Sequence, residues 1–419
     1  MPLNVSQATF FVGIDWAAAG HAVCVLDADG HRVMSFTVEH SAAGLAGLVT
    51  RLARLGEAAD MPVAIERPDG KLVDALLEAG HPVVPVKPNA IKTWRDGEVL
   101  SGAKSDDRDA EVIAEYLRLR HHRLSLATPY SPETKALRTV VRTRSDLVEM
   151  RVAATNQLSA LLELHWPGAK AIFADVESPI ALEFLTRFPT ARHAAHLGVK
   201  RLAAFCAKHG YSGRRSAEQL LARLRAAPAG TTDETLCEAI RDAVWALVAV
   251  LKALGAGLKD LGRSVIAHLD EHPDAKIFTS LPRSGQINAA QMLAEWGDCR
   301  QAYDGPEALA ALAGASPVTN QSGKHRAVHF RWACNKRFRK AVTTFADNSR
   351  HDSAWAAHVY AQARSRGHDH PHAIRVLARA WIRVIFPCWI NGVPYDPGQH
   401  GNAARLTRTG QTGTVSARG

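Results

Sequence analysis

The spacing of apolar residues changes at Ser131, and this change constrains the fold more than any other feature of the sequence. Before Ser131, short apolar runs of strand length alternate with stretches in which leucines recur at helical intervals. After it, apolar residues recur at helical intervals over much longer stretches. The sequence therefore predicts an α/β domain followed by mainly helical regions.

The first region, residues 8–130, has the pattern of a mixed sheet flanked by helices. Strands are expected at 10–14, 23–26, 33–38, 62–65 and 83–86, and helices at 45–55 and 72–77. A turn that ends in Gly30 joins the second and third strands and predicts a hairpin. Three antiparallel strands, a crossover helix and parallel strands are the expected order.

The second region, residues 131–275, contains two long helical stretches. Apolar residues of the later stretch step by three and four without a break: Val244, Leu247, Leu251, Leu254, Leu258, Leu261 and Val265. In the earlier stretch Arg144 and Arg151 interrupt a similar stripe. The two helices are expected to pair as an antiparallel coiled coil or to form a dimerisation arm. Ordinary bundle helices are the alternative, and residues 167–230 receive no interpretation.

The third region, residues 276–396, is expected to be mainly helical. A helix over 306–313 is followed by the segment SPVTNQSGKHR, which predicts a polar loop, and then by a basic helix. Residues 397–419 are rich in Gly, Thr and Arg and are expected to form a disordered tail.

Charge and composition indicate the cellular compartment of the protein and the class of its partner. The formal charge is +10 over 419 residues, with a pI near 9.5, which favours a polyanionic partner, with nucleic acid ahead of a membrane. The six cysteines are scattered without a CxxC pair, as in a reducing cytoplasm. No segment has the roughly 20 apolar residues of a membrane span. We expect an unexported protein of the bacterial cytoplasm, associated with the nucleoid.

Four carboxylates stand at positions that predict a metal site. Asp15 ends the strand in GIDW and Glu66 ends the strand in VAIE, so both should lie at the carboxyl edge of the sheet. Asp106 and Asp109 share one face of the first turn of a helix that Ser105 can cap, whereas Asp107 points elsewhere. Taken alone, each acid is more often an ordinary turn or helix-start residue, and it is the four together, in this order and on these elements, that indicate a metal site.

Four clustered negative charges are costly unless a cation neutralises them. Hard oxygen ligands suit Mg²⁺ or Mn²⁺. Two such ions about 3.5–4 Å apart could activate the attacking oxygen and stabilise the leaving oxygen in phosphodiester cleavage.

The order GIDWA, VAIE and KSDDRDAEVIAEYL resembles the DEDD-type transposases of the bridge-RNA insertion sequences, the IS110 (IS-one-ten) family. The resemblance covers nearly the whole chain. It implies a ribonuclease-H-like (Holliday-resolvase-like) N-terminal domain, a coiled-coil arm and a C-terminal transposase domain. It also implies that the metal ligands are Asp15, Glu66, Asp106 and Asp109.

The C-terminal segment LAGASPVTNQSGKHRAVHFRWACNKRFRKAV is similar to the signature segment of that family. The resemblance implies that Ser322 is a nucleophile that becomes covalently attached to DNA, in a composite site with the metals. From the residues alone, SGK is an ordinary polar turn. A serine hydroxyl needs activation, and no triad spacing is visible, so the metal cluster is the expected activator. Ser316, which precedes Pro317, is the rival serine.

Basic and aromatic residues surround Ser322. The expected nucleic-acid contacts are Lys324, Arg326, Arg331, Lys336, Arg337, Arg339 and Lys340. Trp332 and Phe338 offer planes on which bases could stack. Possible catalytic helpers are His21, His325 and His329.

The resulting prediction is a DNA transposase or recombinase that acts on donor and target DNA. The resemblance implies guidance by a bridge RNA and a homodimer that assembles into a tetramer. One alternative is a metal-dependent Holliday-junction-type nuclease that uses water, without serine chemistry. Another is a non-catalytic nucleic-acid-binding protein.

Overall fold

The computed structural model describes residues 8–67, 69–98, 106–127, 129–322 and 325–398. These residues belong to two compact units. The first comprises Met1–Ser131 with Asp298–Ala310, and the second comprises Pro132–Gly297 with Ala311–Gly419. The predicted Ser105 cap, Lys324 and nearly all of the predicted tail lie outside the described residues.

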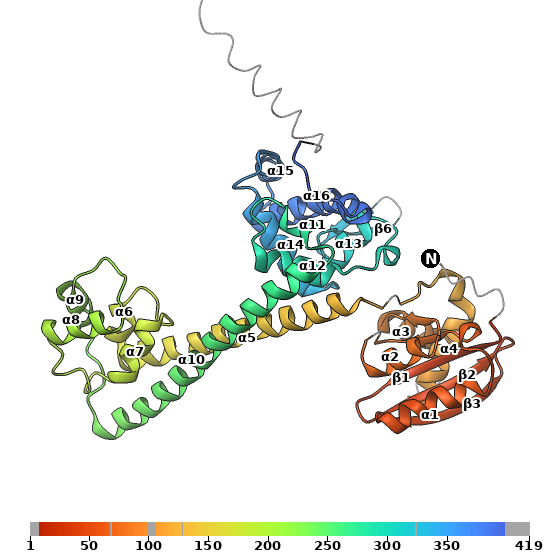
Figure 1. The fold of residues 1–419 in the computed structure, drawn as a ribbon, viewed down its shortest axis with the longest axis horizontal. Helices are drawn as coiled ribbons and strands as arrows, with labels where there is room; N and C mark the ends of the chain where they lie inside the picture. Colours follow the sequence, from red (N-terminus) through yellow and green to blue (C-terminus); the bar gives the residue numbers. More distant parts are fainter. Residues whose placement is uncertain (1–7, 68, 99–105, 128, 323–324, 399–419) are drawn as a thin grey trace, which may run out of the picture. The chain divides into compact units, whose positions relative to one another are not determined.

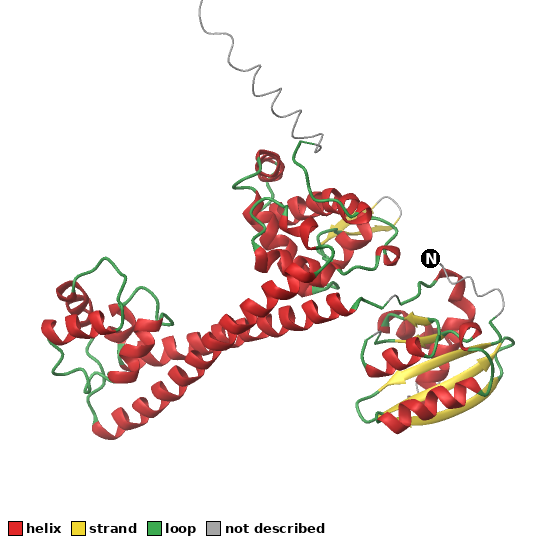
Figure 2. Cartoon of the chain, viewed as in Figure 1, coloured by secondary structure: helices red, strands yellow, loops and turns green. Residues whose placement is uncertain are grey.

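The first unit contains a five-stranded mixed sheet, drawn in yellow in Figure 2. Its strands are β1 Phe10–Trp16, β2 Gly20–Asp27, β3 Arg32–Glu39, β4 Val63–Ile65 and β5 Val83–Pro85, in the spatial order β3-β2-β1-β4-β5. The strands β1, β2 and β3 are antiparallel neighbours, whereas β4 runs parallel to β1 and β5 parallel to β4. The predicted mixed sheet is confirmed, and its order is compatible with a ribonuclease-H-like fold.

Helices cover both faces of this sheet. They are α1 Ala42–Ala53, α2 Lys71–Glu78, α3 Pro88–Glu98 and α4 Asp106–Arg120, with short 3₁₀ turns at Ala58–Asp60 and His121–Arg123. Successive residues of β1 point to opposite faces. Val12 therefore packs with Leu48 and Leu72 of α1 and α2, while Phe11 packs with Ile113 of α4. Two separate apolar layers hold the sheet.

Two long helices of the second unit, α5 Pro132–His165 and α10 Glu234–Glu271, lie side by side and run antiparallel (Figure 1). At one end of the pair, Thr134 hydrogen-bonds to His272 at 2.8 Å. At the other end, the Thr231 amide donates to the His165 carbonyl at 2.8 Å. The helices therefore pair, and a coiled-coil supercoil stays a prediction.

The apolar seam of α10 divides into two rows. Val244, Leu251, Leu258 and Val265, seven residues apart, are buried, whereas Leu247, Leu254 and Leu261 between them are only half-buried. One row is therefore covered more completely than the other. Although α5 and α10 are long, none of the described helices has the apolar length needed to cross a membrane.

Residues 167–230, which the sequence left without interpretation, form a cap of short helices at one end of the α5–α10 pair (Figure 1). The helices are α6 Pro167–Ile172, α7 Pro179–Arg187, α8 Val199–Lys208 and α9 Ala217–Ala226. The ring of Phe184 lies 5.9 Å from that of Trp166 and 5.8 Å from that of Phe205, centroid to centroid. An aromatic core therefore holds this segment together.

The C-terminal part is mainly helical, as predicted. Its elements are α11 Ala275–Thr279, α12 Gln286–Trp296, a 3₁₀ turn at Arg300–Ala302, α13 Pro306–Leu312, β6 Val318–Ser322, β7 His325–His329, α14 Lys336–Ser349, α15 Ala354–Ser365 and α16 His370–Asn391. The predicted polar loop is wrong: β6 and β7 form an antiparallel hairpin in which Ser322 pairs with His325. Residues 323–324, which join the two strands, lie outside the described residues.

Candidate active site

Asp15 and Glu66 lie at the carboxyl ends of neighbouring strands. Ile14 of β1 pairs in parallel with Ile65 of β4, and each acid is the next residue along its strand. Asp15 is still within β1, where it pairs with Ala22, and Glu66 directly follows β4, so the backbones of the two half-buried acids are neighbours at one edge of the parallel pair. The sheet therefore places the first two predicted ligands together.

The helix α4 carries the other two acids. Asp106 is its first residue and is exposed, as is Asp107, whereas Asp109 is half-buried. The helix packs directly on β1: a Cβ at Gly13 would collide with the carbonyl oxygen of Ala110 and the amide nitrogen of Ala114. Only glycine permits this approach. The part of α4 that directly follows its first turn therefore lies against β1, two residues before Asp15.

Arg95 of α3 holds Asp109 in an ion pair. Its Nη1 lies 2.9 Å from Oδ1 of Asp109, and the Asp109 side chain is 13% exposed. A charge-assisted bond of this kind occupies a carboxylate oxygen that a metal ion would also use. This partner could not be predicted from sequence spacing, because residues 95 and 109 belong to different helices.

The donor chemistry of the four acids fits a hard divalent cation, but their arrangement is not yet that of a closed metal site. Among the described residues, one group of three possible ligands has ligand atoms all within 4.8 Å of one another, and it consists of Asp27, Asp29 and His31. This group contains none of the four predicted ligands, so metal binding by those ligands stays a prediction.

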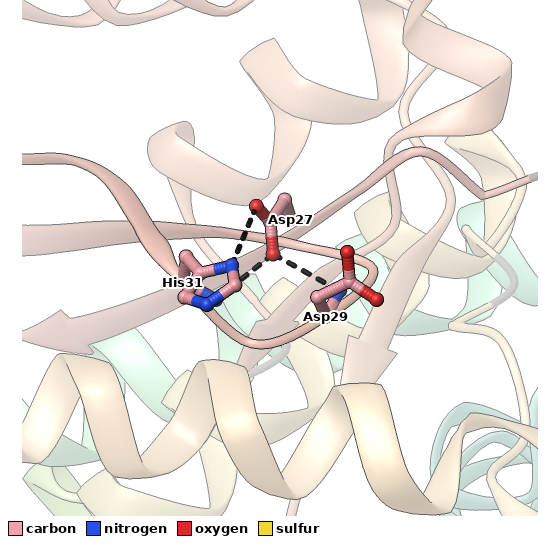
Figure 3. Close-up of side chains that lie close together, drawn as sticks. All are labelled: Asp27, Asp29 and His31. Atoms are coloured by element: carbon pink, nitrogen blue, oxygen red, sulfur yellow. Dashed lines mark hydrogen bonds and ion pairs between the residues drawn. The ribbon is translucent and has the colours of Figure 1, made fainter.

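Asp27, Asp29 and His31 form the turn between β2 and β3 (Figure 3). The Asp27 carboxylate accepts the backbone amides of Asp29 at 3.0 Å and His31 at 2.8 Å. The bond from the His31 amide is the main cause that lowers the pKa of Asp27. These bonds are those of an ordinary Asx-type turn, so the group closes a hairpin.

Ser322 is the last residue of β6, and its backbone is described. The side chains of residues 320–326, which include those of Ser322, His325 and Arg326, lie outside the described part of the structure. The rival Ser316 precedes β6, and its carbonyl accepts a bond from Nε of Arg331 at 3.0 Å. This contact is structural. The four acids belong to the first unit and Ser322 to the second.

The predicted nucleic-acid contacts differ in exposure. Lys336, Arg337 and Lys340 are exposed on α14, and Arg337 pairs with Asp146 of α5 at 2.7 Å. Arg331 and Arg339 are half-buried, and Arg339 donates a hydrogen bond to the Arg331 carbonyl. The exposed three are the better placed to contact phosphate.

One predicted stacking plane is wrong. Phe338 is fully buried and packs against the ring of Trp296, because it lies on the inner face of α14. Trp332 is 78% exposed, so stacking of a base on its ring stays a prediction. Of the proposed helpers, His329 is exposed. His21 is 0% exposed and hydrogen-bonds to His40 at 2.8 Å, and burial lowers its pKa. His21 is therefore a core residue.

Two features of the structure were not predicted from the sequence. Arg375, Arg379 and Arg383 recur every four residues along α16 and line a groove, a spacing that was visible in the sequence. Glu295 is 2% exposed and accepts two bonds from Arg142, each of 2.8 Å, and one from Asn335 at 2.7 Å. It joins α5, α12 and the start of α14, and no sequence pattern marks such a contact.

Comparison with known proteins identifies the class of the chain. A transposase family model matches residues 12–167, and the model described as the transposase IS116/IS110/IS902 family matches residues 275–361. These matches define a DNA-processing enzyme of the transposase class. Since the first model is that of DEDD transposases, use of a divalent metal ion is implied.

Similar proteins come from insertion elements. The transposase assigned to the IS117 mini-circle of Streptomyces coelicolor is 32% identical over 390 residues, which cover 91% of this chain and 94% of the relative. A 44.8 kDa protein of insertion element IS116 from Streptomyces clavuligerus is 28% identical over 90% of this chain and 93% of its own. An IS900 protein of Mycobacterium paratuberculosis is 26% identical over 92% of this chain and 97% of its own length. The chain belongs to the IS110/IS116/IS902 family of transposases.

Proposed function

We propose that this transposase cuts and joins DNA through a covalent serine–DNA intermediate, with Ser322 as the nucleophile. Its Oγ attacks a phosphodiester phosphorus and loses its proton, and the displaced deoxyribose oxygen leaves as a hydroxyl and gains one. The new serine phosphodiester conserves the bond for rejoining, when a DNA hydroxyl displaces Ser322 in turn. Ser322 ends a strand of a hairpin, which gives its backbone a defined position.

The proposed metal ligands are Asp15, Glu66, Asp106 and Asp109, with Mg²⁺ or Mn²⁺ as the ion. The observation that carries this proposal is the parallel pairing of β1 with β4, which sets Asp15 beside Glu66. The packing of α4 on Gly13 supports the place of the other two. A bound divalent ion would neutralise the acids and polarise phosphate oxygens.

The proposed partners are donor DNA, target DNA and a bridge RNA. The formal charge of +10 and the exposed Lys336, Arg337 and Lys340 support a polyanionic partner. With an RNA guide, base pairing would select the sequence, and the protein would hold backbones and shape. We further propose that the α5–α10 pair acts as a coiled-coil arm, and that dimers assemble into tetramers in the bacterial cytoplasm.

A covalent-capture experiment tests the serine chemistry. The full chain is incubated with a labelled DNA substrate, its guide RNA and Mg²⁺, and denaturing gels report protein–DNA adducts. Ser322→Ala is expected to lose the adduct and to retain binding of the substrate. Ser316→Ala, a matched control, is expected to keep the adduct.

The same experiment separates the alternatives. Cleavage by Ser322→Ala without an adduct would support a water-using junction nuclease instead. Unchanged behaviour of Asp15→Ala, with no metal-dependent cleavage by either protein, would support a non-catalytic binding protein.

A further inference from the structure

A basic groove of about 450 Å³ opens between β7 and α16. Four arginines and two histidines line it: Arg331, Arg375, Arg379, Arg383, His329 and His372. Among the described residues that line the groove, none is acidic. The remaining lining is apolar or glycine, so the groove combines positive charge with contact surface.

Three arginines of α16 lie in a row on one face of the helix. Arg375, Arg379 and Arg383 are four residues apart, so they rise along one helix face at intervals of about 6 Å. Guanidinium groups form paired hydrogen bonds with phosphate oxygens. A row of such groups is suited to a chain of phosphates more than to a single small anion.

Two guanidinium groups lie over the ring of Phe330, which lines the groove. The guanidinium groups of Arg339 and Arg375 lie 4.5 and 4.7 Å from the centre of the Phe330 ring. Burial lowers the pKa of Arg375, the charge of Asp369 opposes this, and the charge of Arg339 adds a smaller lowering. Gathering like charges costs free energy that a bound anion would relieve.

An exposed aromatic ring favours a single strand as the anion. Trp332 is 78% exposed, and its ring lies 4.8 Å from that of Phe330, centroid to centroid. Cationic grooves with exposed aromatic rings are typical of sites for single-stranded nucleic acid, because unpaired bases stack on the rings. A double helix keeps the faces of its bases covered.

The hairpin connects this groove with Ser322. At its base, His329 of β7 pairs with Val318, and at its other end His325 pairs with Ser322. Four residues of strand span about 13 Å. A strand lying in the groove can therefore continue along the hairpin to the serine.

We infer that the groove between β7 and α16 binds the single strand of DNA beside the phosphate that Ser322 attacks. The choice of DNA rests on the proposed function, whereas binding of a single strand by the groove does not. Arg375 and Arg379 would hold phosphates and Trp332 would stack a base.

The test measures binding by fluorescence anisotropy, using the full chain with Ser322→Ala to prevent covalent capture. The probes are one sequence as single-stranded DNA, as single-stranded RNA and as duplex DNA, each titrated with salt. The double substitution Arg375→Gln with Arg379→Gln should weaken single-stranded DNA binding at least tenfold. It should also reduce the salt slope by about 1.4, which is 0.7 for each of two phosphates. Losses on RNA and on the duplex should be smaller.

Two further proteins keep the result interpretable. Arg364→Gln with Arg366→Gln removes the same charge from exposed positions at the end of α15 and should leave the affinity within twofold. Trp332→Ala, at an exposed position that does not threaten folding, should weaken single-stranded DNA binding about tenfold.

Equal binding by the groove variant and the α15 control would overturn the inference, as would a loss confined to RNA or the duplex. If the arginine variant fails to fold, unchanged binding of single-stranded DNA by Trp332→Ala would overturn the inference instead. An adduct that persists in Ser322→Ala would contradict the serine chemistry and leave the binding result standing.

Discussion

At the residue scale, the ion pair between Arg95 and Asp109 has a direct consequence for metal binding. A carboxylate that already pairs with a guanidinium must exchange that partner for the ion. The 2.9 Å contact is largely shielded, since the Asp109 side chain is 13% exposed and that of Arg95 is 27% exposed. In the proposed metal site, Arg95 would therefore compete with the ion for Asp109.

Arg95→Gln is accordingly expected to raise the affinity for Mn²⁺ about tenfold, as the loss of a bond to a charged group implies. Calorimetric titration of the full chain with Mn²⁺ measures this without any catalysis. Lys92→Gln on the exposed side of α3 is the control and should change little. Weaker Mn²⁺ binding in Arg95→Gln would show that Arg95 supports the site.

Glu295 is the clearest stability determinant among single residues. Burial alone would raise its pKa, but the bonds from Arg142 and Asn335 and the charges of Arg142 and Arg138 outweigh it and lower the pKa. A lowered folded-state pKa stabilises the fold above the unfolded-state pKa. That stability is lost as the pH falls through the folded-state value.

Glu295→Gln is expected to reduce the free energy of unfolding by about 2–3 kcal/mol at neutral pH, because it leaves the partly exposed Arg142 bonded to a neutral group. Urea denaturation at pH 7 and in the acid range measures this, and the difference from wild type should shrink in acid. Asp260→Asn, which breaks an exposed ion pair with Arg263, should cost no more than about 1 kcal/mol. Equal effects of the two substitutions would contradict this account.

At the element scale, α4 is positioned by small residues. Ala110 and Ala114 are fully buried against Ala22 and Cys24 of β2, and Gly13 leaves room for the helix backbone. Since Asp106 and Asp109 belong to the first turn of α4, the packing of the whole helix decides where these acids lie. The backbone of α4 therefore packs directly against the backbone of β1 at Gly13.

Gly13→Ala should therefore displace α4. We expect a loss of about 1–3 kcal/mol in unfolding free energy, typical of an overpacked core. A fall in Mn²⁺ affinity should accompany it. Gly47→Ala on α1, where a Cβ meets nothing within 4 Å, is the control and should stabilise the protein by up to about 1 kcal/mol. Thermal unfolding with Mn²⁺ titration measures both, and an unperturbed Gly13→Ala protein would refute the close packing.

At the scale of the whole molecule, the proposed chemistry draws on both units. The four acids lie in the first unit and Ser322 lies in the second. A composite site of this kind can be completed within one chain or between two chains. Closed symmetric dimers allow the second arrangement to occur twice.

We expect completion between chains, because the family resemblance implies a homodimer. Mixing Asp15→Ala with Ser322→Ala protein should then restore adduct formation to about a quarter of the wild-type level, since half the dimers are mixed and each carries one intact site. Gel quantification of the adduct measures this. No restoration after subunit exchange would place the site within one chain.

The sequence by itself determined the strands of the first unit and the two long helices of the second, but not the hairpin of β6 and β7 or the helices of residues 167–230. Strand runs and the helix over 306–313 were predictable because apolar periodicity reflects local burial. The place of Asp15 and Glu66 at strand ends was predictable for the same reason. The roles of these acids and of Ser322 rest on family resemblance and stay predictions.

Only the tertiary structure decided which residues meet. It set β1 between β2 and β4, paired Arg95 with Asp109, buried Phe338 against Trp296 and joined β6 to β7. It also placed the α16 arginines opposite β7. The physical reason is that each contact joins residues from different elements, and their meeting depends on the packing of the whole unit.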